Sequence, residues 1–252
     1  MERSARTSIA TFYAPDEPFV PGAALTLGPE TAQHMMVRRM ATGEPIRLVD
    51  GAGHVAAAVV VRLARGMATV QVDAVESMAP LPAVHVLAPI ADRDRMLWLA
   101  EKCAEFGVAS WRPVLWKRSR SVKPRGEGPT FSARLRARMA AALEQSGAAF
   151  LPTIFPDANC DRAIAGAAEG TRLVLDGSGE PVAVSAIVAA PVTIAVGPEG
   201  GFEAAELEAL EAGRFQRVSL GPNILRFETA LLAGVAIARA ALASRLQGVS
   251  DV

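Results

Sequence analysis

The pattern of apolar and polar residues divides the chain into two parts with different periods. From about residue 9 to residue 75, short runs such as EPIRLVDG, HVAAAVVVRL and MATVQVDAV carry alternating or β-branched apolar residues between Gly and Pro. A period of two is typical of strands that bury one face. We therefore predict a small antiparallel barrel or sandwich here, interrupted by a helical turn at 31–40.

A break follows this β-rich part. The segment MAPLP at 78–82 has two prolines in five residues. Such punctuation ends one set of elements before the next begins. The sequence predicts two domains, 1–77 and 78–252.

Beyond the break, strand patterns alternate with helix patterns. Residues 83–90 form an apolar run typical of a buried strand, and 95–106 place apolar residues at i, i+3, i+4 and i+7. A strand near 111–116, a helix at 132–145 and the strand TRLVLDG continue the alternation. This β-α order predicts an α/β domain with a mostly parallel sheet that helices cover on both faces.

Two apolar runs between residues 192 and 230 each end in Gly-Pro. They read VTIAVGPEGGF and RVSLGPNILRFETA. In α/β proteins, ligands bind where a strand ends in a glycine-rich turn. We expect the active site in this stretch.

The first loop is compatible with an ordinary strand-to-helix turn that has an acidic cap, or with a ligand site. Phosphate binding fits poorly, because the loop lacks the GxxxxGK[ST] pattern and Glu199, Glu203 and Glu206 would repel a polyphosphate. GPEGG also differs from the dinucleotide pattern GxGxxG. The loop nevertheless allows a ligand to approach the backbone closely at its glycines.

The second loop places Arg226 and Glu228 beside Thr229 at the start of a final helix that runs to about residue 246. These residues form either a salt-bridged, capped helix start or a site in which Arg226 orients an anionic or carbonyl group. The helix is apolar nearly all round except for Arg239 and Arg245. Such a helix is typical of a core or of a subunit contact, and we expect both.

Composition narrows the class of protein. The 252 residues include 26 Lys and Arg against 26 Asp and Glu, and the two cysteines and three histidines form no ligand-spaced cluster. The N-terminus lacks the apolar segment of a signal peptide, and no uninterrupted apolar run reaches the roughly 18 to 20 residues of a membrane span. We expect a soluble, cytoplasmic protein with no membrane contact and no bound metal.

Charge is unevenly distributed within this neutral chain. Between Lys117 and Arg138 there are eight basic residues and a single acid, Glu127. A solvated loop and helix face explains this stripe as well as contact with phosphate groups does. The basic residues are Lys117, Arg118, Arg120, Lys123, Arg125, Arg134, Arg136 and Arg138.

The two loops together carry a specific resemblance. VGPEGGF followed by LGPNILRFETA resembles the paired motifs of the SPOUT methyltransferases and, among them, the ribosomal RNA small subunit methyltransferase E (RsmE) family. EKCAEFGVASWRPVLWKRS and ALEQSGAAFLPTI are similar to further segments of that family. The similarity is strongest from about residue 83 onward.

The resemblance implies a fold and a reaction. The fold would be an N-terminal PUA-like RNA-binding β-barrel followed by a SPOUT α/β domain with a deep trefoil knot. The reaction would be methylation at N3 of a uridine in 16S rRNA of the 30S subunit by a homodimer, with S-adenosylmethionine (SAM) as the cofactor. Other readings are a SPOUT enzyme for another RNA and a non-catalytic RNA-binding assembly factor.

Residues carry over from the family motifs one by one. Arg226 would stabilise the uracil anion, and Glu228 would orient that arginine or accept the N3 proton. Leu175 would lie against the cofactor, and Arg38 and Arg39 match a segment of the N-terminal domain that we expect to bind RNA together with the basic stripe. The cofactor loops would comprise Gly197, Glu199, Gly200, Gly201, Leu220, Gly221, Ile224, Leu225 and Thr229.

The chain also departs from the family pattern. Phe227 stands where the family usually has Thr between the Arg and the Glu, so packing beside the substrate would differ. Ala148 and Ala149 occupy the region in which the family often has Arg.

Overall fold

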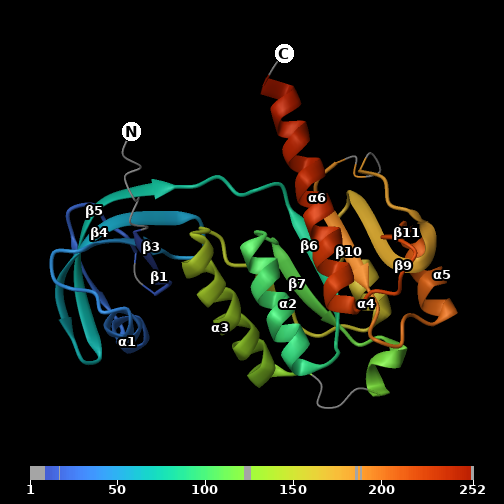
Figure 1. The fold of residues 1–252 in the computed structure, drawn as a ribbon, viewed down its shortest axis with the longest axis horizontal. Helices are drawn as coiled ribbons and strands as arrows, with labels where there is room; N and C mark the ends of the chain where they lie inside the picture. Colours follow the sequence, from blue (N-terminus) through green and yellow to red (C-terminus); the bar gives the residue numbers. More distant parts are fainter. Residues whose placement is uncertain (1–8, 17, 122–125, 185–186, 188, 251–252) are drawn as a thin grey trace. The chain divides into compact units, whose positions relative to one another are not determined.

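The computed structural model describes residues 9–16, 18–121, 126–184, 187 and 189–250, without the side chains of 120–121 and 246–250. The chain divides into two compact units (Figure 1). The first comprises Met1–Pro80 with Ala140–Leu151, and the second comprises Leu81–Met139 with Pro152–Val252.

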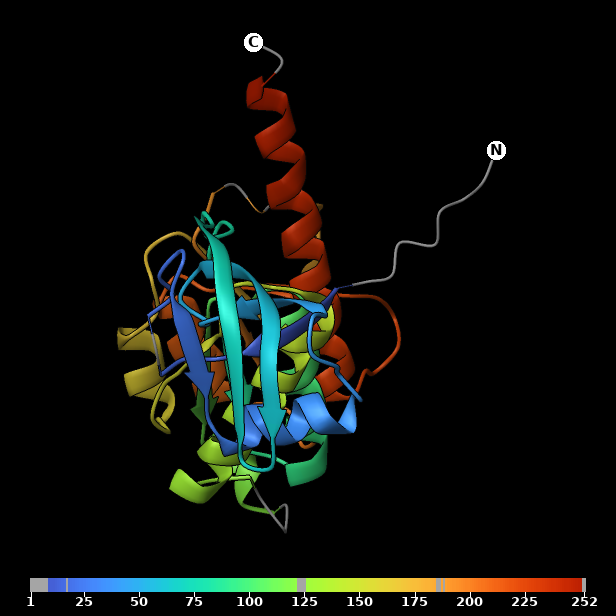
Figure 2. The ribbon, with the colours of Figure 1, turned by 90° about the vertical axis from the view of Figure 1, so that its left-hand side faces the viewer.

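The described residues of the first unit form a five-stranded sheet, helix α1 and the C-terminal end of a helix that begins in the second unit. The sheet has the order β1-β3-β4-β5-β2. Helix α1 contacts β4 and β5 and lies across one end of them (Figure 2). The elements are β1 (Ala10–Tyr13), β2 (Ala24–Leu27), α1 (Pro29–Val37), β3 (Pro45–Val49), β4 (His54–Ala64) and β5 (Met67–Ser77).

The alternating runs bury one face of this sheet. Phe12, Leu48, Val60 and Val70 are almost fully buried and pack together with Met35 of α1. The apolar residues of the alternating runs therefore lie on one face of the sheet and form the core of the unit.

Two expectations about this unit were wrong. Strands β1 and β2 are the two edges of an open sheet, and the described residues form no closed barrel. Strand β1 also pairs with β3 in parallel, whereas antiparallel pairing was expected. The long connection through β2 and α1 permits this parallel pair, because a short hairpin cannot join parallel strands.

The segment Ala140–Leu151 belongs to the first unit although it follows more than half of the chain. The Gly53 N–H donates to the carbonyl of Ala149 over 3.0 Å, and the Leu151 N–H donates to Gly51 over 2.8 Å. Leu143 is fully buried against Val49. The hydrophobic periodicity of the sequence did not predict that this segment would pack in the first unit.

The second unit is built on a six-stranded sheet of order β11-β9-β10-β6-β7-β8, in which every pair is parallel. This confirms the predicted parallel α/β sheet. The elements are β6 (Val84–Pro89), α2 (Arg93–Glu105), β7 (Ser110–Val114), the 3₁₀ helix η1 (Lys117–Ser121), α3 (Pro129–Ser146), β8 (Thr153–Ile154), α4 (Cys160–Ala165), β9 (Thr171–Pro181), β10 (Val192–Val196), α5 (Ala204–Ala212), β11 (Gln216–Ser219) and α6 (Phe227–Ser250).

Helices cover both faces of this sheet (Figure 1). Successive residues of β10 face opposite sides. Ala195 packs with Leu210 of α5 and Ala163 of α4, whereas Ile194 faces Gly234 of α6. The apolar runs without polar alternation therefore reflect strands that are buried on both faces.

Helix α6 packs closely on the sheet at Gly234. A Cβ there would lie 2.9 Å from Leu175 Cδ1, so only glycine allows this approach without a shift. By length and composition, Phe227–Arg245 would also be apolar enough to cross a membrane, a test that core helices of soluble proteins pass as well. Its buried residues on the sheet side include Leu231, Val235, Ala238 and Leu242.

Candidate active site

The loops after β10 and β11 lie at one edge of the parallel sheet. Strand β9 pairs with both strands, and Leu175 of β9 is in register with Val196 at the end of β10. Because the strands are parallel, their carboxyl ends share an edge, which is where open α/β sheets bind ligands. The two glycine loops of the sequence are therefore brought together by β9. The Leu175 side chain itself is buried toward α6.

The first loop has a shape that requires its glycines. Gly201 has a φ of 71° and donates its N–H to the Pro198 carbonyl over 2.8 Å. A Cβ on Gly197 would lie 3.1 Å from the Phe202 ring, and one on Gly200 would lie 3.2 Å from Arg118 Cβ. The tight turn leaves the loop backbone close to its neighbours without intervening side chains.

Glu206 holds this loop to the rest of the unit. Its side chain is buried, with Oε2 accepting from the Glu203 N–H over 2.9 Å and Oε1 accepting from the Lys117 N–H over 2.8 Å. Both N–H groups lie at starts of helical segments, where donors lack partners within the helix. Glu206 is thus a structural cap, whereas Glu199, which we expect to contact the cofactor, remains partly exposed.

The basic stripe begins against the first loop. Arg118 donates from Nη1 to the Gly200 carbonyl over 2.7 Å, and the side chain of Lys117 is exposed. The side chain of Arg120 and the whole of Lys123 and Arg125 lie outside the described residues. Of the five basic residues between 117 and 125, the structure therefore places the side chains of two.

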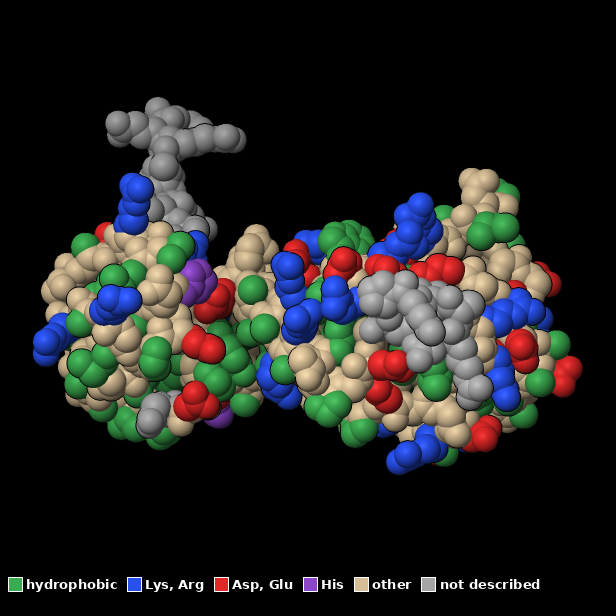
Figure 3. Space-filling view, turned by 90° about the horizontal axis from the view of Figure 1, so that it is seen from below, with side chains coloured by type: hydrophobic (Ala, Val, Ile, Leu, Met, Phe, Trp, Pro, Cys, Tyr) green, Lys and Arg blue, Asp and Glu red, His purple; other side chains and the backbone are tan. Residues whose placement is uncertain are grey.

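Acidic side chains of other elements lie near the remainder of the stripe, so the surface around it is not uniformly basic. Arg138 of α3 lies 3.6 Å from Glu101 of α2. On the face drawn in Figure 3, Lys and Arg side chains of the second unit alternate with Asp and Glu side chains. Acids from other elements therefore neutralise part of the charge that one stretch of sequence presents.

The second loop presents apolar side chains to solvent. Ile224 is fully exposed and Leu225 is 39% exposed, whereas Phe227 is buried. Leu220 is partly exposed, and Gly221, which has a φ of 148°, and Thr229 are exposed. An exposed apolar segment beside a glycine loop is suited to covering a ligand.

Arg226 and Glu228 flank the buried Phe227 at the start of α6. Arg226 is exposed, and its carbonyl accepts from the Ala230 N–H over 2.9 Å. The Glu228 side chain is only 12% exposed. Its Oε2 is buried and has no hydrogen-bond partner among the described residues. A buried carboxylate oxygen without a partner is costly, so the site favours a donor from a ligand.

A residue that the motifs did not reveal connects the two loops. Arg95 Nη1 lies 3.8 Å from Glu199 Oε1 in the first loop, and Arg95 Nε lies 3.9 Å from Glu228 Oε1. Asp92 caps α2 by accepting from the Arg95 N–H over 3.0 Å. Its position along the chain could have indicated this role, because Arg95 follows the carboxyl end of β6, the strand next to β10.

The other predicted RNA contacts lie in the first unit. Arg38 ends α1, and its guanidinium carbon lies 5.9 Å from the centre of the Phe12 ring. Arg39 is exposed and adopts a φ of 57°. Neither residue belongs to the compact unit that carries the two loops.

Comparisons with known proteins agree with this geometry. Residues 77–239 match the model of the family described as RNA methyltransferase domain. The ribosomal RNA small subunit methyltransferase E of Mycobacterium bovis is 30% identical over 237 residues, which are 87% of either chain.

Two solved structures are similar over nearly their whole length. The ribosomal RNA small subunit methyltransferase E of Neisseria gonorrhoeae, bound to S-adenosyl methionine, is 27% identical with a TM-score of 0.82, over 92% of this chain and 97% of that one. The methyltransferase Lpg2936 of Legionella pneumophila, in complex with SAM, is 28% identical with a TM-score of 0.81, over 92% of this chain and 98% of that one.

Proposed function

Because this chain belongs to the RNA methyltransferase domain family and, within it, to the ribosomal RNA small subunit methyltransferase E family, we propose that it methylates N3 of a uridine in 16S rRNA. The observation that carries the proposal is the meeting of the two glycine loops with Arg226 and Glu228 at one sheet edge.

The residues of this edge fit SAM. Gly200 and Gly201 carry no side chains of their own, and a Cβ on Gly201 would meet nothing within 4 Å. The exposed Ile224 and Leu225 offer an apolar surface for an adenine ring. The buried Oε2 of Glu228 lacks a donor among the described residues. Bound SAM would supply a methyl group that is already activated on a sulfonium, so no protein nucleophile is required.

The chain's own residues would then act on the base. Uracil must lose the proton on N3 before or during transfer, and this leaves a negative charge on the ring. The exposed guanidinium of Arg226 is suited to stabilising that charge. Glu228, held near Arg95, would orient Arg226 or accept the proton.

A methylation assay with mapping of the product tests this proposal. Purified protein, SAM and either 30S subunits or naked 16S rRNA are incubated, and the modified nucleotide is located by mass spectrometry. We expect 3-methyluridine at a single position. Methylation of another RNA or another base atom would contradict the proposed substrate, and SAM-independent RNA binding without transfer would favour an assembly factor.

Three further properties belong to the proposal. The reaction would take place in the cytoplasm, and the protein would act as a homodimer through the half-buried apolar face of α6, which includes Leu232, Ala236 and Ile237. Light scattering should give the mass of two chains, and a monomer at assay concentration would contradict this. The resemblance also implies a trefoil knot in the second unit, which tracing the chain in a crystal structure would test.

A further inference from the structure

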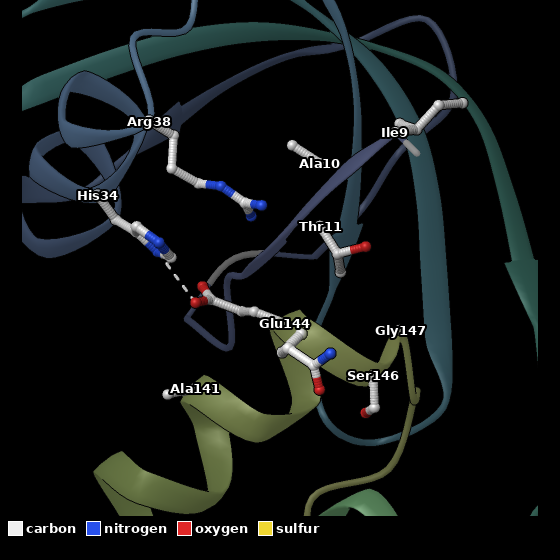
Figure 4. Close-up of a pocket in the computed structure, with 10 residues that line it drawn as sticks. Ile9, Ala10, Thr11, His34, Arg38, Ala141, Glu144, Ser146 and Gly147 are labelled. Carbon is white, nitrogen blue, oxygen red and sulfur yellow. Dashed lines mark ion pairs between the residues drawn. The ribbon is translucent and has the colours of Figure 1, made fainter. Parts of the chain in front are cut away.

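A cavity of about 550 Å³ lies wholly within the first unit. Strand β1, the end of α1 and the C-terminal end of α3 form its walls (Figure 4). Sites for small organic molecules usually have volumes of about 300 to 1,000 Å³. The residues that line the cavity include Ala10, Thr11, His34, Arg38, Glu144 and Gln145.

Two nitrogen-bearing side chains are held side by side on one wall. His34 and Arg38 are four residues apart along α1 and its cap, so they share one face of the helix. Both rest on Phe12, which is fully buried: the His34 ring meets it edge to face at 5.4 Å, and the Arg38 guanidinium lies 5.9 Å from its centre. Figure 4 shows the guanidinium pointing toward β1. The aromatic support restricts both side chains before any ligand arrives.

Glu144 fixes the orientation of the histidine. Its Oε2 lies 2.9 Å from His34 Nδ1 (Figure 4). Its Oε1 accepts from the Tyr13 N–H over 2.8 Å. One contact on each carboxylate oxygen holds Glu144 in place beside the histidine. Because Nδ1 faces Glu144, Nε2 is the ring nitrogen that is available to a ligand.

The remaining walls carry neutral polar and small apolar groups. Thr11 and Gln145 line the cavity with a hydroxyl and an amide, and Ala10 adds an apolar surface. An amide offers both a donor and an acceptor, which matches the edge of a base, whereas a guanidinium matches a phosphate. The combination of an arginine, an oriented histidine and an amide in one cavity suits a nucleotide.

We propose that this cavity binds one unpaired nucleotide of the RNA substrate, with its phosphate on Arg38 and its base against Gln145 and Thr11. The inference rests on the proposed function only in taking RNA as the substrate. Sequence-specific recognition of RNA commonly reads unpaired bases that are turned out of the stack. The cavity would therefore contribute to selecting the site that is methylated.

Substitution of Arg38 tests the proposal by steady-state kinetics with 16S rRNA. Arg38→Met should raise the KM for RNA about tenfold, with kcat and the SAM affinity unchanged, and Arg38→Lys should restore part of the loss because it keeps the charge without the planar fork. Arg62→Met is the matched control, because Arg62 is an exposed arginine of β4 in the same unit. We expect its KM to stay within about twofold of the wild-type value, since one distant surface charge contributes little.

A second measurement identifies the ligand without enzymatic turnover. Uridine monophosphate is titrated into the full chain while backbone amide shifts are followed by NMR, and Gln145→Leu should weaken its binding several-fold. We expect shifts in β1 and at the end of α3. Equal effects of Arg38→Met and Arg62→Met on the KM, or the same shifts with inorganic phosphate alone, would overturn the nucleotide site. Failure of the wild-type protein to methylate RNA would instead refute the proposed function. The titration would still show whether the cavity binds a nucleotide.

Discussion

Arg95 Nε lies 3.9 Å from Oε1 of Glu228, so a residue at the start of α2 reaches the first turn of α6. The same guanidinium lies 3.8 Å from Glu199 in the loop after β10. One cation thus stands between carboxylates of the two loops. Without it, the two negative charges would repel each other across the site.

Replacing Arg95 should reduce turnover more than cofactor binding. In Arg95→Met the two loops lose their common partner, and we expect kcat to fall about tenfold, because a displacement of about 1 Å in an active site costs up to about 100-fold. Arg95→Lys should recover part of the rate. Methyl transfer and calorimetric SAM binding would be measured for both variants.

Arg93→Met is the control for this prediction, since Arg93 is a partly exposed neighbour on α2 whose Nε lies 3.7 Å from Asp94 Oδ1. Its kinetics should match the wild-type enzyme. A wild-type rate in Arg95→Met would remove this residue from the site.

Arg226→Ala should abolish most turnover while cofactor binding persists. The side chain is exposed at the second loop and is suited to stabilising the charge that develops on uracil. Loss of one such charge-stabilising donor costs about 100-fold or more in kcat. We expect the Kd for SAM to change by less than about threefold. Arg162→Ala on α4 is the control, and a normal rate in Arg226→Ala would contradict the proposed role.

Glu206→Ala should destabilise the protein without touching a ligand. The buried carboxylate accepts from Glu203 and Lys117 N–H groups, and both donors would lose their partner. Leaving buried donors unsatisfied costs about 2 kcal/mol of unfolding free energy. Urea unfolding would measure the loss. Glu208→Ala, an exposed change on the same helix, should alter stability by less than about 0.5 kcal/mol, and equal losses would contradict the role of Glu206.

The buried His85 should cause the free energy of unfolding to fall as the pH becomes acidic. Burial on β6 lowers the pKa of His85 below its ordinary value of 6.5, and its Nδ1 lies 2.7 Å from Ser110 Oγ. The unfolded chain therefore binds a proton that the folded chain resists, so stability is full above about pH 6.5 and declines as the pH falls below it. The melting temperature of His85→Gln should depend less on pH between 8 and 5.5 than that of the wild type. An unchanged dependence would exclude His85 as a cause.

Local chemistry was sufficient to predict most elements of the second unit. The run at residues 83–90, the helical spacing at 95–106 and the Gly-Pro strand ends all correspond to observed elements, because period and backbone preference act over a few residues. The two loops were likewise visible as motifs. Their fit to one site needed only the rule that parallel strands share a carboxyl edge.

Relations between distant segments were not predictable in this way. The first unit was expected to form an antiparallel barrel or sandwich, yet β1 pairs in parallel with β3, and the described strands form one open sheet. The acidic cap that the first loop allowed is Glu206, but its second contact, with the Lys117 N–H from another segment, was not predictable. Alternation states which face of a strand is buried, and it does not state which strand lies beside it.

The sequence by itself determined most of the strands and helices and the two glycine loops, because these depend on hydrophobic period and on the conformations open to Gly and Pro. Only the tertiary structure decided that Arg95 stands between Glu199 and Glu228, and that Glu144 meets His34 in the first unit. These contacts join residues that are far apart along the chain. They follow from strand order and from the packing of α2 and α3, which no local pattern encodes.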